Sequence, residues 1–275
     1  MPSSDATAGP CRRDADARDR PATGPLAGRP LARCVGLARR AGRLRQGASL
    51  EQYLARIADA HFVLDEIDRR QRDDPAWQRV QPDTIGLCGH SFGAGLTQAI
   101  AGERAPGLQR AAGSGLPAAA DAIRDARPRA FIAFSPGFGA TESDADLSLA
   151  ATARFGRIER PFLCVTGTLV NAMIVGDASN ATRRAVYRAL PAGQAAELAL
   201  KGADHMTFGG RESPVERSAA LRREAGAAQL EPGHRLVVAQ LTSDWWRWRL
   251  LGDNVARLGL IAPAGLSAGD SWQQG

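Results

Sequence analysis

Apolar positions along the chain form one stripe at helical spacing, followed by several short unbroken runs. The stripe begins after residue 48, where Ser49 and Gln52 fit the N-cap and N3 positions of a capping box. Its members are Tyr53, Ile57, His61, Phe62, Leu64 and Ile67. This pattern predicts a helix over residues 50–71 with these side chains on its inner face.

The short apolar runs are bounded by turn residues and alternate with helical stretches. The predicted strands are residues 84–88, 129–134, 161–166 and 195–200. The helices predicted after the first are residues 94–102, 180–190 and 235–251, the last with Trp245, Trp246 and Trp248. The second and third strands are apolar at consecutive positions, which is typical of parallel strands buried on both faces. We therefore expect an α/β fold, a mostly parallel sheet with flanking helices.

Residues 1–48 differ in composition from the rest of the chain. They are rich in Arg, Ala, Gly, Pro and Asp without periodicity, so we expect an irregular or disordered basic segment before one α/β domain over residues 49–275. The first 50 residues hold ten arginines against four aspartates, whereas the remainder balances at 25 basic and 25 acidic residues. Because the basic segment has no aromatic side chain to stack on bases, we expect no nucleic-acid site.

Cysteine usage and hydropathy predict the compartment. Cys11, Cys34, Cys88 and Cys164 form no C-x-x-C pair, which disfavours a structural zinc site or a redox pair. Cys88 and Cys164 lie in apolar runs, and we expect both to be buried free thiols in a reducing compartment. No apolar stretch approaches the length of a spanning helix, and the N-terminus lacks the apolar core of a secretion signal. These features predict a soluble cytoplasmic protein that binds no membrane.

The run Gly89-His90-Ser91-Phe92-Gly93 joins the first predicted strand to a helix. It matches G-x-S-x-G, the nucleophile elbow, in which a serine in a strained strand-to-helix turn projects its hydroxyl beyond the sheet. We expect the turn to need the small residues Gly89 and Gly93. The Phe92 N–H, at the start of the helix, is the expected oxyanion donor. The alternative is that Ser91 merely caps a helix.

His205 is the candidate base among four histidines. His61 lies inside the first predicted helix, and His90 belongs to the elbow and is expected to point away from Ser91. His234 follows a Pro-Gly turn and is expected at the surface. His205 follows the last predicted strand, where a doubly wound sheet returns its base to the serine. The alternative is a loop histidine that only hydrogen-bonds locally.

A catalytic triad also needs an acid that orients the imidazole. Chain order places it between Ser91 and His205, in the loop after the strand over residues 161–166. The first carboxylate in that loop is Asp177, which becomes the candidate acid if the loop folds back. Asp204, beside the base in sequence, is expected to be a surface or turn residue.

Three runs together indicate a family: Gly86-Leu87-Cys88-Gly89-His90-Ser91-Phe92-Gly93-Ala94, Val165-Thr166-Gly167-Thr168 and Gly202-Ala203-Asp204-His205. With Trp245-Trp246 and Leu251-Gly252-Asp253, they resemble the predicted dienelactone-hydrolase and platelet-activating-factor-acetylhydrolase-like branch of the α/β-hydrolase superfamily, over residues 50–275. The resemblance implies hydrolysis of a small ester or lactone through an acyl-enzyme, with Ser91 and His205 in the family's serine and histidine positions. It implies no metal and no organic cofactor.

Two features depart from that family. The position of its catalytic aspartate is Val170 here, and loss of this acid in a triad lowers turnover by about 10⁴. Nothing in residues 1–48 resembles the strands and oxyanion loop that normally precede the elbow, so we expect an N-terminally incomplete sheet with the elbow strand at its edge. Such an edge is covered, aggregates or pairs with another chain, which predicts self-association there. One hypothesis is that residues 1–48 come from a shifted reading frame or a truncated gene model.

The sequence therefore leads to two functional hypotheses. In the first, the protein is a serine carboxylic-ester hydrolase in which Ser91 attacks and His205 shuttles the proton. Phe92 N–H holds the oxyanion and Asp177 orients the base. In the second, the protein is a catalytically impaired or dead relic, or a binding module on the same scaffold, because a fold does not guarantee a function.

Overall fold

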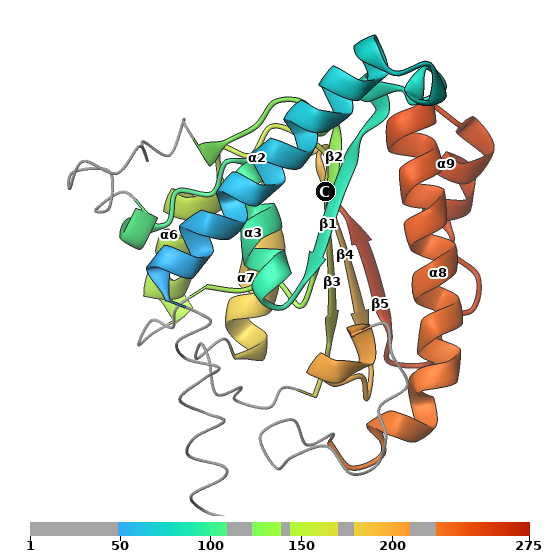
Figure 1. Ribbon diagram of the computed structural model, residues 1–275. Helices are drawn as coiled ribbons and strands as arrows, with labels where there is room; N and C mark the ends of the chain where they lie inside the picture. Colours follow the sequence, from blue (N-terminus) through green and yellow to red (C-terminus); the bar gives the residue numbers. More distant parts are fainter. Residues whose placement is uncertain (1–48, 109–122, 139–143, 170–178, 210–223) are drawn as a thin grey trace, which may run out of the picture.

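Five strands form a single sheet in the computed structural model of the chain (Figure 1), which describes residues 49–108, 123–138, 144–169, 179–209 and 224–275. The strands are β1 (Gly86–His90), β2 (Ala130–Phe134), β3 (Phe162–Gly167), β4 (Ala195–Leu200) and β5 (Ser271–Gln274). The helices are α2 (Leu50–Asp73), α3 (Phe92–Ala101), α6 (Asp144–Phe155), α7 (Asn180–Ala189), α8 (Ala227–Leu251) and α9 (Asn254–Ile261). The expected disorder of residues 1–48 lies outside the described residues.

The strand order in the sheet is the order along the chain, β1-β2-β3-β4-β5. β1 to β4 are parallel, and β5 pairs antiparallel with β4. β2, β3 and β4 are almost completely buried, which the consecutive apolar residues of β2 and β3 predicted. The mostly parallel α/β sheet with flanking helices is thus confirmed, and β5 was not predicted.

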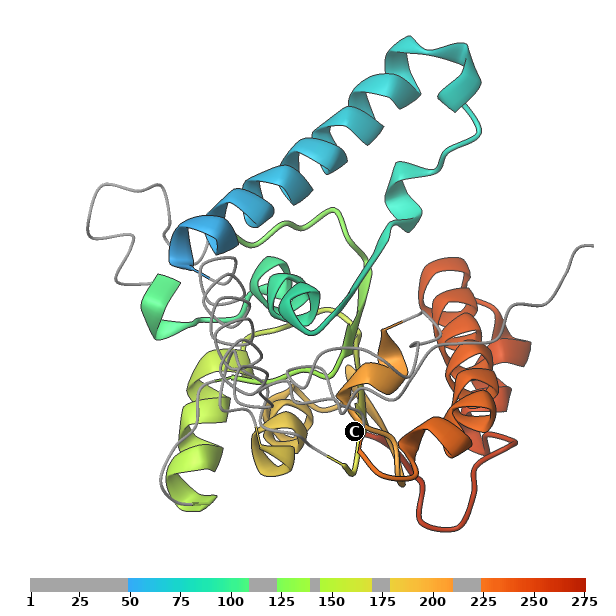
Figure 2. The same ribbon diagram turned by 60° about the horizontal axis from the view of Figure 1, so that its bottom comes forward.

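Helices cover both faces of the sheet (Figures 1 and 2). α2, α3, α6 and α7 lie on one face, where Phe131, Phe162 and Cys164 face Phe155 and Val186. α8 and α9 lie on the other face; there Ile132, Leu163 and Val165 belong to a cluster with Leu241 and Trp245. Because alternate residues of one strand point to opposite faces, consecutive apolar residues are needed to build both cores.

The first helix, α2, agrees with its sequence pattern except at one position. Ser49 is its N-cap, and its Oγ accepts a hydrogen bond from Gln52 N at 3.2 Å. Ile57 and Leu64 are buried, but Phe62 is 64% exposed. The prediction that Phe62 lies on the inner face was therefore wrong.

The C-terminal helix α8 begins eight residues before its predicted start and includes Pro232. The prediction of a turn and a surface histidine here was wrong, because Glu231 and His234 are both 7% exposed. A proline inside a helix removes one backbone hydrogen bond. The packing of the flanking residues therefore outweighs the local turn signal. Two further helices, α6 and α9, were not predicted.

β1 is the edge strand of the described sheet, as expected for the elbow strand. Ser91 N donates to Phe134 O at 3.0 Å, so the backbone groups of alternate residues point toward β2. Those of Gly86, Cys88 and His90 consequently point to the open edge. The Cys88 side chain is exposed, which corrects its predicted burial, whereas Cys164 is buried as expected. Self-association through this edge stays a prediction.

Candidate active site

Ser91 lies in the turn between β1 and α3, where its backbone is strained. Its φ of 59° and ψ of −115° fall in a region that residues with a Cβ rarely adopt. The hydrogen bond from its amide to Phe134 O continues the β1–β2 ladder up to the turn. The strand-turn-helix geometry of the expected elbow is present, and no hydrogen bond from the Ser91 side chain caps α3.

The two glycines of the elbow have unequal roles. A Cβ on Gly89 would lie 2.1 Å from the carbonyl oxygen of Gly93, far inside van der Waals contact. A Cβ on Gly93 would meet no atom of the described residues within 4 Å. The expected need for a small residue is therefore confirmed at Gly89, whereas no described atom imposes it at Gly93.

His205 reaches Ser91 from the loop that follows β4. It is the first residue of the 3₁₀ helix η3 (His205–Phe208), and its Nε2 lies 2.8 Å from Ser91 Oγ. In the tautomer that a base requires, the serine hydroxyl donates to Nε2 and Nδ1 carries the proton. The sequence prediction that these two side chains meet is borne out by this distance.

Nδ1 of His205 is buried and has no hydrogen-bond partner among the described residues. The candidate acid Asp177 and the substituted position Val170 both lie outside the described residues. Asp204 does not take the role of the acid, because its carboxylate accepts from Thr207 N, Thr207 Oγ1 and Glu224 N. Asp204 is 1% exposed, so it is a turn residue as expected, and the surface alternative was wrong.

The protonation of His205 follows from its surroundings. Burial, then the neighbouring His90 and Arg183, lower the pKa of His205 to about 3, and the Asp204 carboxylate opposes this shift. His90 packs against the base, with ring centroids 4.7 Å apart, and its Nε2 lies 2.8 Å from His205 O. Burial also lowers the pKa of His90. Both imidazoles are therefore neutral at neutral pH.

The start of α3 is suited to hold a negative charge near Ser91. Among the described residues, the amides of Phe92 and Gly93 donate to no acceptor. Free N–H groups at a helix N-terminus, together with the helix dipole, favour an anion. The Phe92 ring packs edge-on against Tyr53 from α2, with centroids 5.4 Å apart. The described residues thus offer backbone donors on one side of the serine.

Asp204 fixes the segment that carries the base. Its side chain and Thr207 form a reciprocal capping box across η3. We expect Asp204→Ala to lower the free energy of unfolding by about 2 kcal/mol, because three donors lose their acceptor. Asp204→Asn, which keeps one acceptor oxygen, should lose less. Urea unfolding of the three proteins measures this, and equal losses for Ala and Asn would contradict it.

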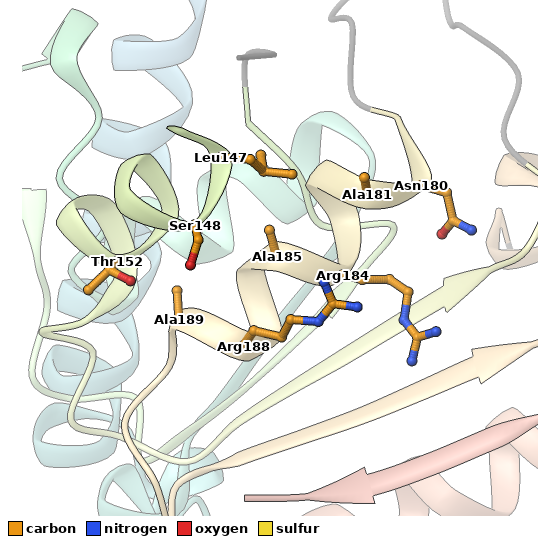
Figure 3. Close-up of a pocket in the computed structure, with 9 residues that line it drawn as sticks. All are labelled: Leu147, Ser148, Thr152, Asn180, Ala181, Arg184, Ala185, Arg188 and Ala189. Carbon is orange, nitrogen blue, oxygen red and sulfur yellow. The ribbon is translucent and has the colours of Figure 1, made fainter. Parts of the chain in front are cut away.

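A cavity of about 410 Å³ lies between α6 and α7 (Figure 3). Its walls include Leu147, Ala185, Arg184 and Arg188, and neither Ser91 nor His205 lines it. Within the described ranges, no group of three His, Cys, Asp or Glu side chains is arranged to hold a metal ion.

No protein-family model matches the chain, and no curated protein matches it. No helix in the described part of the chain combines the length and apolarity needed to cross a bilayer.

Two residues near the elbow were not identified from the sequence. Ser135, directly after β2, has a φ of 55° and is buried. Arg183 in α7 is 6% exposed. An arginine in the apolar stripe of a helix is unusual, and this marks the position but not its role, which depends on contacts outside α7.

Proposed function

We propose that the protein is a serine hydrolase of carboxylic esters that acts on a small ester or lactone, on an α/β-hydrolase-like scaffold. The observation that supports this is the 2.8 Å contact between His205 Nε2 and the hydroxyl of a strained Ser91 at a strand-to-helix turn. A cytoplasmic location and a small-molecule partner are part of the same proposal.

The chemistry uses two half-reactions. Ser91 Oγ attacks the carbonyl carbon while its proton moves to His205 Nε2, and the resulting oxyanion lies at the amides of Phe92 and Gly93. The tetrahedral intermediate collapses, the C–O bond to the leaving alcohol breaks, and that alcohol takes the proton from His205. Water then attacks the acyl-enzyme with His205 again as base, releasing the acid and free Ser91. Water and these groups balance the reaction without a cofactor.

A second candidate function is a catalytically impaired scaffold or a binding module. The described residues supply no partner for Nδ1 of His205, and this favours the second candidate, because an imidazole without an orienting acceptor is a poor general base. Free backbone donors beside Ser91 still allow such a scaffold to bind a carbonyl or an anion.

Covalent labelling with a fluorophosphonate tests the proposal. The probe should attach to Ser91 in the folded protein, as located by peptide mass spectrometry, and the heat-unfolded protein should not react. Ser91→Ala is the control variant. Labelling that persists in Ser91→Ala refutes Ser91 as nucleophile, whereas a folded wild type without labelling favours the scaffold hypothesis.

The pH profile of labelling reports whether a carboxylate contacts His205. Because the pKa of His205 is lowered to about 3, labelling should stay constant from pH 8 to about pH 5. The acid limb is the pH range in which labelling decreases because His205 takes up a proton. A partner acid at Nδ1 would stabilise the imidazolium and move this limb up to about pH 6.5 or higher. A midpoint of the labelling rate near pH 6.5 would therefore contradict the expectation and point to a carboxylate outside the described residues.

The same depressed pKa makes stability depend on pH. The unfolded chain takes up a proton at His205 near pH 6.5, and the folded chain does so only near pH 3. The contribution of neutral His205 is therefore complete above pH 6.5 and decreases as the pH falls toward 3. Urea unfolding at pH 7.5 and 5 should show a smaller loss in His205→Gln than in the wild type; equal losses would contradict this.

A further inference from the structure

The backbone that follows β2 is held beside the nucleophile from its first peptide. Phe134 O accepts the hydrogen bond from Ser91 N, and Ser135 N donates to Val165 O at 2.7 Å. Residues 135–137 therefore leave the sheet at the edge where Ser91 stands, between the ends of β1 and β3.

Arg183 anchors the next two peptides of this segment. Its Nη1 donates to Ser135 O at 2.7 Å and to Pro136 O at 3.0 Å. Burial lowers the pKa of Arg183 to about 10, so the guanidinium remains charged at neutral pH. No carboxylate in the described part of the chain pairs with it. Burying a cation away from a counter-ion is costly, and here its hydrogen bonds go to the two carbonyls.

Gln98 of α3 fastens the third peptide. Its Nε2 donates to Gly137 O at 3.0 Å, and Gly137 N donates back to its Oε1 at 3.1 Å. Gln98 is 1% exposed, and its Nε2 also donates to the buried Glu103. Since α3 begins at the elbow, this double contact links residues 135–137 to the helix that follows Ser91.

Ser135 shows why the segment needs these anchors. Its φ of 55° is strained for a residue with a Cβ, and such strain persists only where the surroundings over-determine the backbone. Strain of this kind concentrates at active sites and ligand clamps. Here the anchors come from the turn after β1, from β3, and from α3 and α7.

We propose that Arg183 is a positioning residue of the Ser91 site, which holds residues 135–137 as a rigid wall for the acyl group of the ester. The inference rests on the proposed function, because the wall has a use only if Ser91 accepts an acyl group. In this proposal Arg183 contacts residues 135–137, and residues 135–137 contact the acyl group of the ester.

The charge of Arg183 gives a second effect, on the base. Within the described ranges, the ionisable groups that act on His205 are His90 and Arg183, which lower its pKa, and Asp204, which raises it. Removing the cation should therefore raise the pKa of His205. A merely structural arginine would not move the pH profile of the site.

The test compares Arg183→Met and Arg183→Lys with Arg188→Met. Arg188 is an exposed arginine one turn further along the same helix, and it contacts neither carbonyl. In Arg183→Met, hydrogen exchange in the peptide that contains residues 135–137 should speed up by about tenfold or more. Fluorophosphonate labelling of Ser91 should slow by about 10- to 100-fold, mostly through weaker probe binding, with the acid limb at higher pH. Arg183→Lys should recover part of the rate, and Arg188→Met should match the wild type.

Gln98→Met is a second route if Arg183→Met does not fold. This substitution removes the hydrogen bonds to Gly137 but keeps the positive charge of Arg183. Hydrogen exchange in residues 135–137 should therefore speed up and labelling of Ser91 should slow, while the acid limb of the pH profile stays at the same pH. Faster exchange with unchanged labelling in either variant overturns the inference and leaves the proposed function intact. A folded wild type that is never labelled overturns the proposed function and the inference together.

Discussion

Replacing His205 by glutamine is expected to slow the reaction of Ser91 with a fluorophosphonate or an activated ester by at least about 100-fold. In a complete triad, removing the histidine costs about 10⁶ in turnover, and loss of the acid alone costs about 10⁴. If His205 acts without an acid, only about 10² remains to be lost; among the described residues its Nδ1 has no partner. The size of the effect therefore measures how much of a triad is present.

The control for this experiment is His90→Gln. His90 packs on the base and its Nε2 contacts His205 O, but it does not contact Ser91 Oγ. We expect a much smaller loss, of about tenfold, from the disturbed position of His205. If the two variants lose the same activity, His205 is not the base; if His205→Gln loses about 10⁶, a carboxylate outside the described residues orients it.

Gly89→Ala is expected to destabilise the protein by about 3 kcal/mol or more and to remove labelling of Ser91. The new Cβ would lie 2.1 Å from Gly93 O, a backbone atom at the start of α3, so either the strand or the helix must move. Both elements determine where Ser91 Oγ stands. Urea unfolding and probe labelling of the same preparation measure the two effects.

Gly93→Ala is the matched variant for stability. Its Cβ meets no atom of the described part of the chain within 4 Å, and an alanine in a helix is favoured over glycine by about 1 kcal/mol. We expect this variant to be as stable as the wild type, or more stable by about that amount. If Gly93→Ala destabilises the protein as strongly as Gly89→Ala, the elbow is not packed in the way the structure shows.

The parallel sheet was predictable because its strands are buried on both faces. Consecutive apolar residues such as Phe131-Ile132 and Leu163-Cys164 leave little alternative to a strand between two helical layers. β5 was missed since Ser271–Gln274 is polar at three of its four positions and pairs only with β4. The start of α8 was missed because Pro232 is a strong local signal, whereas the burial of His234 depends on tertiary packing.

The candidate site was predictable as far as local sequence determines it. The elbow is specified within five residues, and His205 stood out by its place after the last parallel strand. Arg183 and Ser135 were missed because their role depends on contacts between α7 and the end of β2, which no local pattern encodes. The unequal roles of Gly89 and Gly93 likewise depend on a single backbone approach across the turn.

The sequential strand order has a consequence for how the chain acquires its structure. The crossovers between the parallel strands each contain a helix, and parallel sheets fold more slowly than structures built from local contacts. Each parallel strand nevertheless pairs with the next strand along the chain, so no pairing among β1 to β4 skips a strand. During synthesis the sheet can therefore grow from β1 toward β4. Ser91 follows β1 and His205 follows β4, so the contact between them forms only after β4 has emerged.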